Sequence, residues 1–219
     1  MASDCIIIKP IIRADFCMKT LLKISQTTKM PCPSWSLEAV KTCPGSRKPD
    51  GNLVDACSKC YADKGFYKMK PAKNLRIHNK QDWKTDDWVP EMVSYLRDYA
   101  RFRWFDSGDM YALPLAKKIL QVCEQTPWVK HWIPTRQHKF AKFMNTLKKL
   151  KALPNVSVRF SSDSIDGEYT KGLHGSTILP SAYHKTDAFV CQAFLRGGKC
   201  GDCRACWDKS IPLIGYPIH

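Results

Sequence analysis

The sequence of 219 residues lacks a long hydrophobic run, and no apolar stretch approaches the ~18 residues of a membrane-spanning helix. Its beginning also lacks a basic segment, and Lys9 and Pro10 interrupt the first apolar run, so we do not expect a secretory signal peptide. Both absences argue against membrane and secreted proteins. We therefore expect a cytoplasmic protein with no membrane partner.

The motifs of several large enzyme classes are missing as well. The chain contains no P-loop, no dinucleotide-binding G-x-G-x-x-G motif and no G-x-S-x-G nucleophile motif. Its six histidines are scattered and form no H-E-x-x-H zinc-protease motif. We therefore assign no catalytic residue, and whether the protein is an enzyme stays open.

Acidic residues are few relative to basic ones. Asp and Glu number 20 against 35 Lys and Arg, which leaves a formal net charge of +15. Because a positive surface field attracts polyanions, nucleic acid or an acidic protein is a candidate partner. The basic residues that we expect at such a surface are Lys68, Lys70, Lys73, Arg76, Lys80 and the segment 139–151.

Cysteine is more frequent than usual, but it stays below the ~8–10% of a disulfide-stapled scaffold. The 11 cysteines are also odd in number. In a cytoplasmic chain, metal binding is then the leading interpretation. Four cysteines stand apart from any tight cluster and are predicted to be small buried apolar residues: Cys5, Cys17, Cys32 and Cys123.

The C-terminal cysteines form one group. Cys191 is followed by Cys200, Cys203 and Cys206, and the last three follow a C-x-x-C-x-x-C pattern. Consecutive thiols at this spacing resemble a ferredoxin pattern, in which the chain wraps a cubane, whereas structural zinc is usually held by paired knuckles. The spacing favours a 4Fe-4S cluster, with zinc or metal-free reduced thiols as alternatives.

A second group, nearer the start of the chain, has three thiols only. Cys43 is followed by Cys57 and Cys60, with no adjacent histidine to complete the set. Three cysteines can hold three corners of a cubane and leave one iron open to a small molecule. The alternative is that Cys32, or one thiol of the C-terminal group, closes the site.

The middle of the chain repeats a strand followed by a helix. Strands are predicted over 101–105, 129–133 and 156–160, and the helices between them over 113–125 and 138–151. The strands start a little under thirty residues apart, which is the length of a βα unit and predicts parallel strands with crossover helices. The remaining predicted elements are a helix over 88–99, a long loop over 166–185 and a last strand over 188–190.

Polar residues follow each predicted strand. Ser107, Asp109, Arg136 and Asp163 would cluster at the carboxyl end of a parallel sheet, where ligand sites of α/β proteins lie. They are our candidate cofactor-binding residues. The alternative is that strand ends are simply exposed and that Asp caps the following helix.

These patterns predict an α/β protein with a partial or complete βα barrel of the TIM type. We expect an N-terminal arm over 1–30 and a barrel-like domain over 31–190 that carries the first cysteine group in a loop. A cysteine-rich C-terminal segment over 191–219 is expected to pack on the same domain.

Several motifs in a fixed order resemble a known family. They are Thr42 to Gly45, Cys57 to Ala62, Ser107 to Asp109 and Cys200 to Trp207, with Arg76, Asn79 and Arg103 between them. Over about residues 30–210 the sequence resembles the bacteriophage family called Gene product 88, which implies a location in the host-cell cytoplasm. More distantly, the first cysteine group resembles the radical SAM superfamily. That resemblance implies that Cys43, Cys57 and Cys60 bind a 4Fe-4S cluster whose open iron chelates S-adenosylmethionine.

We therefore expect a phage-type iron–sulfur protein with one or two 4Fe-4S clusters. Cys191, Cys200, Cys203 and Cys206 would hold a second cluster or lend a fourth thiol to a shared one. If the protein is an enzyme, we expect chemistry of the radical SAM type, with a small molecule at the open iron. The alternative is a basic module that binds nucleic acid or an acidic host protein and uses iron–sulfur or zinc sites as structural staples.

Overall fold

The computed structural model describes residues 22–218 of the chain. Cys5 and Cys17, which the sequence predicts to be buried, lie outside these residues, as does most of the arm predicted over 1–30. No helix among the described residues is long and apolar enough to cross a membrane.

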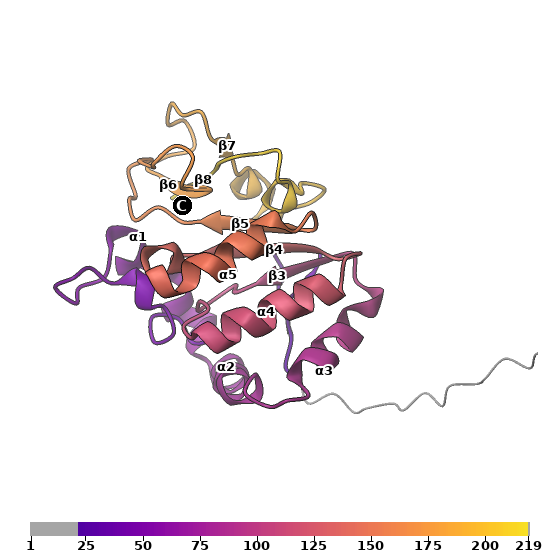
Figure 1. The fold of residues 1–219 in the computed structure, drawn as a ribbon. Coiled ribbons are helices and arrows are strands. Elements are labelled where there is room, and N and C mark those ends of the chain that lie inside the picture. Colours follow the sequence, from indigo (N-terminus) through magenta and orange to yellow (C-terminus); the bar gives the residue numbers. More distant parts are fainter. Residues whose placement is uncertain (1–21, 219) are drawn as a thin grey trace, which may run out of the picture.

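The main sheet has five strands in the order β1-β2-β3-β4-β5. β1 pairs antiparallel with β2, and the other neighbouring strands pair in parallel, as the βα repeat predicts. Within residues 22–218, the one-turn helix α1 (Asp55–Ser58) and four longer helices connect or flank these strands, and α3, α4 and α5 lie along one side of the sheet (Figure 1). The bounds are β1 (Ser25–Gln26), β2 (Pro33–Trp35), β3 (Arg101–Trp104), β4 (Lys130–Thr135), β5 (Val156–Phe160), α2 (Lys70–Asp82), α3 (Trp88–Tyr95), α4 (Leu113–Gln125) and α5 (Ala141–Ala152).

The helices on the sheet form where apolar residues recur at helical spacing. α4 has the predicted bounds, begins with a proline in its first turn and buries Leu115 and Ile119 completely. α5 begins later than predicted, because Gln137–Lys139 form a separate turn of 3₁₀ helix before it. Phe143 and Leu147, one helical turn apart in α5, are fully buried, so α5 turns an apolar side toward the core.

Aromatic side chains fill the space between the sheet and the helices. Trp35 of β2, Trp88 of α3 and Trp104 of β3 are fully buried, and their ring centroids lie 5.4 to 6.2 Å apart. Edge-to-face contacts of this kind add stability beyond the burial of area alone. This core fixes β3, and with it the polar residues that follow at the carboxyl end of that strand.

A second, three-stranded parallel sheet lies beyond β5. It consists of β6 (Ser176–Leu179), β8 (Ile214–Pro217) and β7 (Phe189–Val190), in that order. A single bridge between Ser161 and Ser176 joins it to the end of β5. The long loop predicted over 166–185 is therefore wrong at β6, and the strand predicted as the last one is followed by β8. The two unpredicted strands of this sheet, β6 and β8, are only four residues long, and β1 and β2, which the sequence also does not predict, are shorter still, so none of them displays a clear period.

The opposite face of the main sheet is covered by the C-terminal segment. Trp207, in the 3₁₀ helix η7 (Ala205–Trp207), donates its indole N–H to the Phe102 carbonyl of β3 at 3.0 Å, and η7 packs against β4 and β5. The structure is a mixed α/β fold with a mainly parallel sheet. Among residues 22–218 no strand pairing joins the β1 and β7 edges, so the closed form of the predicted barrel is not shown.

Candidate functional site

The first cysteine group lies on a folded loop that follows β2. The backbone bridge between Arg47 and Leu53 and the bond from the Val54 N–H to the Ser46 carbonyl, 2.8 Å, close this loop. The reversal brings Cys57, in α1 (Asp55–Ser58), back toward Cys43. The Pro-Asp-Gly sequence at the tip of the loop is a turn signal that predicts such a reversal.

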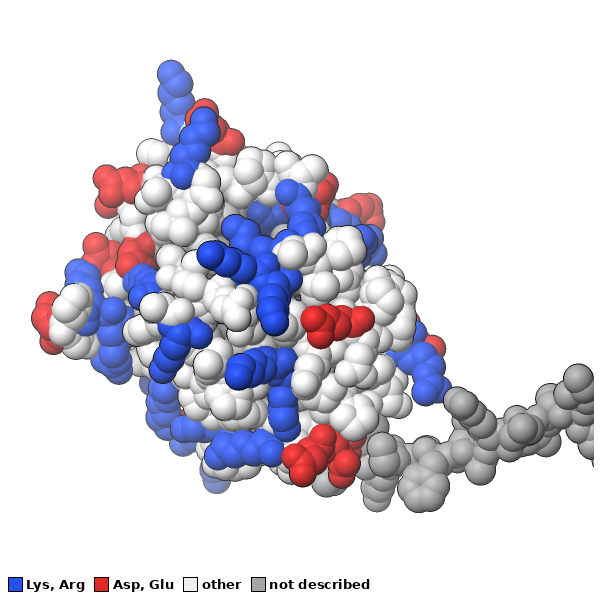
Figure 2. All heavy atoms as spheres, in the orientation of Figure 1, with Lys and Arg blue, Asp and Glu red and all other residues white. Residues whose placement is uncertain are grey.

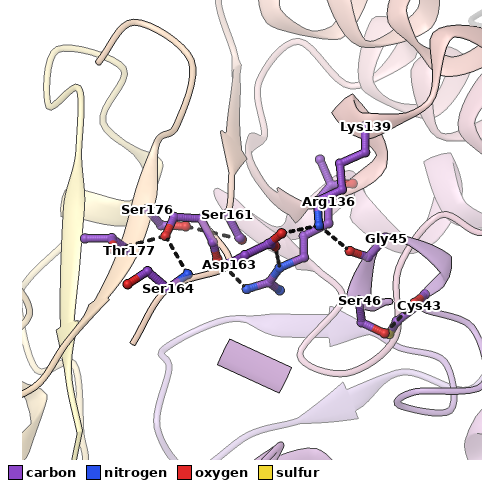
Figure 3. Close-up of polar contacts among 12 residues, drawn as sticks. Cys43, Gly45, Ser46, Arg136, Lys139, Ser161, Asp163, Ser164, Ser176 and Thr177 are labelled. Atoms are coloured by element: carbon purple, nitrogen blue, oxygen red, sulfur yellow. Dashed lines mark hydrogen bonds and ion pairs between the residues drawn. The ribbon is translucent and has the colours of Figure 1, made fainter. Parts of the chain in front are cut away.

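Contacts from β4 and β5 hold the loop at the carboxyl edge of the main sheet. The Ala56 N–H donates to the Asp163 carbonyl at 2.9 Å, and the Lys139 ammonium donates to the Gly45 carbonyl at 2.8 Å (Figure 3). Gly45 lies so close to Arg136 that a Cβ atom at position 45 would be 2.6 Å from the Cβ of Arg136. The approach of the loop to the sheet therefore requires glycine at this position.

Asp163 connects the basic residues of this edge. Its carboxylate accepts a hydrogen bond from Nε of Arg136 at 3.2 Å and another from the Lys139 ammonium (Figure 3). Arg136 also donates to the Ser162 carbonyl at 2.8 Å. Two cations and one carboxylate thus lie together beside the first cysteine group, and of these the strand-end pattern predicts Arg136 and Asp163.

Asp109 and Ser107 are buried, and their polar atoms have partners. Oδ1 of Asp109 accepts from the Thr135 hydroxyl at 2.7 Å, and Oδ2 accepts from the Arg136 N–H at 2.9 Å. The Ser107 hydroxyl donates to the Leu37 carbonyl at 2.7 Å and accepts from Arg76. These contacts indicate that Asp109 orients the start of the Arg136 segment, and that Ser107 ties the loop after β3 to α2.

Burial and nearby charges both shift the pKa values of thiols in the first group. Burial raises the pKa of Cys43, and the Asp109 carboxylate and the two other thiols raise it further. Burial also raises the pKa of Cys57, whereas Arg136 and Lys139 lower it. A ligand that binds thiolates would therefore find two compensating cations at Cys57.

Backbone strain occurs on both sides of this group. Val40 has φ 63° and Phe105 has φ 58°, values that are rare outside glycine and unusual for a β-branched residue. At Gly108, where φ is 79°, a Cβ atom would be 2.6 Å from Leu37 and 2.7 Å from Thr42. Strain of this kind often accumulates at functional sites.

The C-terminal cysteines lie on the face of the main sheet that the helices leave free. Cys200 and Cys206 pack with Trp132 and Trp207, and the thiol of Cys206 is 3.3 Å from the Tyr216 hydroxyl. Cys32 lies in the same cluster, although the sequence leaves it as a candidate to close the first group. Cys191 and Cys203 influence the pKa of Cys200, so they lie near the same thiols.

All nine described cysteines are free, and none forms a disulfide. Within residues 22–218, no three or more Cys, His, Asp and Glu side chains are arranged to hold a metal ion. The predicted ligands lie in two neighbourhoods, and the clusters themselves stay predictions. A cavity of about 530 Å³ opens beside Cys203 and is also lined by Arg196, Arg204 and Phe189.

Two arginines near the C-terminal thiols have no role predicted from the sequence, although Arg103 is among the residues that carry the family resemblance. Arg103 of β3 and Arg159 of β5 have charged side chains on the face that η7 covers, and both influence the pKa of Cys206. An arginine within a predicted strand whose neighbours are apolar is the only signal that could have found them.

Similarity to known proteins relates the chain to one family. A family model described as Gene product 88 matches residues 15–209, a span that contains both cysteine groups. No curated protein and no solved structure matches.

Proposed function

The chain belongs to the Gene product 88 family, and from that premise we propose that it is a phage-type iron–sulfur protein. In this proposal Cys43, Cys57 and Cys60 bind one 4Fe-4S cluster. One observation carries it: a closed loop brings these thiols together at the carboxyl edge of a parallel sheet, beside Arg136 and Lys139.

The donor set fits such a cluster. Thiolate sulfur is a soft ligand that suits iron–sulfur clusters, and the nearby guanidinium and ammonium groups offset the negative charge of a thiolate-bound cluster. Each cysteine of a cubane binds a different iron, so its ligands stand around the cluster instead of meeting at one point. Three cysteines leave one iron without a protein ligand.

The residues around the cluster have separate tasks in this proposal. Arg136 and Lys139 would bind an anionic group of a small ligand, while Asp163 orients both side chains. Asp109 holds the backbone N–H of Arg136 in place. The bound cluster would supply electron transfer and an open coordination position. S-adenosylmethionine is the candidate ligand, on the strength of the three-cysteine motif alone, and the gap between Cys43 and Cys57 is longer than radical SAM proteins usually have.

Anaerobic purification followed by iron, sulfide and zinc quantification tests the cluster. We expect about four irons and four sulfides for each filled cubane, with a broad absorption band near 400 nm. Cys57→Ser is expected to lower both contents, whereas the matched control Cys123→Ser, at a buried cysteine of α4, leaves them unchanged. Zinc without sulfide would overturn the proposal.

A ligand test separates the open-iron part of the proposal from the cluster itself. S-adenosylmethionine should bind to the iron-loaded protein, and one-electron reduction should cleave it. A loaded protein that neither binds nor cleaves S-adenosylmethionine would retain the iron–sulfur assignment and lose the radical SAM assignment.

A second candidate function rests on charge. α5 presents Lys142, Lys148, Lys149 and Lys151 to solvent and contains no acidic residue. Figure 2 shows that Lys and Arg outnumber acidic side chains on the face formed by α4 and α5. Such a face suits the phosphates of nucleic acid. Arg76, which the sequence places on a basic surface, is buried against Ser107 and does not contribute.

Salt-dependent binding of a short nucleic-acid duplex tests this second function. Affinity should fall steeply with added salt, and the slope should become shallower when Lys148 and Lys149 are both replaced by Gln. Lys64 and Lys171, exposed residues outside α5, provide the matched double replacement. Equal slopes for the two variants would remove α5 from the interface.

A further inference from the structure

The structure assigns Cys32 to the C-terminal thiols, and we propose that Cys32 is a ligand of a second iron–sulfur cluster whose negative charge Arg103 offsets. This inference rests on the proposed function for the kind of group that is bound, but not for the site. The first cluster uses other cysteines at the carboxyl edge of the sheet.

Cys32 comes from the segment just before β2, far in sequence from the other thiols of its cluster. Its side chain is buried with Met30, Cys200 and Cys206. The Cys200 N–H donates to the Lys29 carbonyl at 2.8 Å, so a backbone bond fixes the two segments against each other. Contacts between the two ends of the described chain therefore determine where Cys32 lies.

Arg103 lies beside these thiols without a strong partner. Its guanidinium stacks on the Trp132 ring, 4.3 Å from the centroid, and makes only long contacts, 3.4 Å to the sulfur of Met30 and 3.5 Å to the Tyr61 hydroxyl. Nε of Arg103 is buried and has no partner within the described residues. No carboxylate of residues 22–218 lies at ion-pair distance from it.

A second arginine, which is buried, supports the same site from β5. Arg159 is 3% exposed and donates to the carbonyls of Ala205, Cys206, Asp208 and Ile211 at 2.7 to 3.0 Å. All these acceptors are neutral, and no ion pair of residues 22–218 includes Arg159, although the charge of Asp208 acts on it from a longer distance. These bonds also fix the backbone that carries Cys206.

Two cations lie beside this group of thiols, the buried Arg159 and the partly exposed Arg103 with its buried Nε, and together they favour an anion there. In a protein interior, a charge without an opposite charge nearby lowers the stability of the fold by roughly several kcal/mol. Neutral thiols do not balance it, whereas a cubane held by four thiolates is an anion. Among the described cysteines, Cys32, Cys200 and Cys206 lie near Arg103, and Cys191 and Cys203 lie near Cys200.

Arg103 should also tune the second cluster. The reduction potential of an iron–sulfur cluster depends on nearby charge, hydrogen bonds to sulfur and solvent exposure. A nearby positive charge stabilises the reduced, more negative state. Replacing Arg103 by Gln is therefore expected to lower the reduction potential of the second cluster. The potential of the first cluster, at the carboxyl edge of the sheet, should stay unchanged. Arg97→Gln, at an exposed position away from the thiols, is the matched control.

The test uses the full chain purified without oxygen, in four versions: wild type, Cys32→Ala, Cys57→Ser and the control Cys123→Ala. Iron, sulfide and the electron paramagnetic resonance spectrum of the reduced protein are measured for each. Cys32→Ala should lose about half of the iron and sulfide and one of two sets of signals, because one of two cubanes is missing. The signals that remain show that this variant is folded.

The outcomes separate the two proposals. If Cys32→Ala keeps all of its iron and both sets of signals while Cys57→Ser loses half, the second site as described is wrong and the first stands. If Cys57→Ser changes nothing while Cys32→Ala loses its cluster, the first site is wrong and the second stands. A potential that Arg103→Gln and Arg97→Gln leave equally unchanged would remove the role of Arg103.

Discussion

Single residues decide how closely the segments of this site approach one another, and Gly45 is the clearest case. Its backbone lies directly against Arg136, whose guanidinium binds Asp163. Any side chain at position 45 would push the loop away from the sheet. The geometry of the first cysteine group thus depends on a residue that carries no functional group.

We predict that Gly45→Ala destabilises the protein by about 1–3 kcal/mol, because overpacking forces neighbouring atoms to move. The same variant should bind less iron in the first site, since the loop that carries the thiols would move away from Arg136. Thermal unfolding and iron content measure the two effects. Ser58→Ala, an exposed change in the same loop, serves as the control, and equal behaviour of the two variants would contradict the prediction.

His131 is a buried histidine that the proposed chemistry does not use. It accepts the indole N–H of Trp104 at 3.2 Å and lies 2.8 Å from the Thr126 hydroxyl. Burial lowers its pKa to about 3. Below pH ~6.5 the unfolded chain therefore takes up a proton at this histidine that the folded protein does not.

Folding stability should then fall as the pH drops from about 6.5 toward 3, by up to about 1.4 kcal/mol for each pH unit from this residue. His131→Phe removes the titrating group together with its hydrogen bonds. We expect this variant to be less stable than the wild type at pH 7 and to lose less stability than the wild type between pH 7 and pH 5. Urea unfolding at pH 7 and at pH 5 measures the difference, and equal losses of stability in the two proteins would rule out His131 as the source.

At the scale of elements, β5 anchors the C-terminal segment through Arg159. The guanidinium satisfies backbone carbonyls of a segment that contains two short 3₁₀ helices, η6 (Ala193–Arg196) and η7, and little other regular structure. Side-chain donors here replace the hydrogen bonds that a longer helix or strand would make.

Arg159→Gln should therefore destabilise the protein by more than about 2 kcal/mol, since several buried carbonyls lose their donor at a cost of about 1–3 kcal/mol each. Trypsin should then cut the C-terminal segment faster in the native state, with Arg196→Gln as an exposed control. Unchanged digestion would show that other contacts suffice to hold this segment.

The elements that the sequence predicts well are those with a strong apolar period. α4, α5 and β5 bury apolar stripes, and their positions are close to the predicted ones. α2 was missed because its buried residues are Arg76 and Asn79, which bind the loop after β3 and the backbone near β2. A polar buried face carries no hydrophobic signal. In the same way, cysteine spacing predicts both thiol groups, but only tertiary contacts bring Cys32 to the second one.

At the scale of the whole molecule, we expect the exposure of each thiol to determine how fast it reacts with alkylating reagents. Cys123 is fully buried, and burial raises the pKa of Cys32 to about 11. Cys60, Cys191 and Cys203 are partly exposed. Only thiolates react readily with alkylating reagents, so reactivity should follow exposure.

We predict that iodoacetamide at pH 7.5 labels Cys60, Cys191 and Cys203 of the metal-free native protein well before Cys32 and Cys123. Mass spectrometry of peptides at several times measures the order, and denatured protein, in which all cysteines should react at similar rates, is the control. Rapid labelling of Cys123 would contradict the burial that the fold gives it.

The order of strands in the smaller sheet has a consequence for synthesis on the ribosome. β8 lies between β6 and β7, although both neighbours precede it in the chain. Until residues 214–217 leave the ribosomal exit tunnel, β6 and β7 lack the strand that lies between them. Cys206 then also lacks its contact with the Tyr216 hydroxyl of β8. We therefore expect the proposed second cluster to be loaded late in synthesis, whereas the loop around Cys43 and Cys57 can pack against β3, β4 and β5 before residues 214–217 emerge.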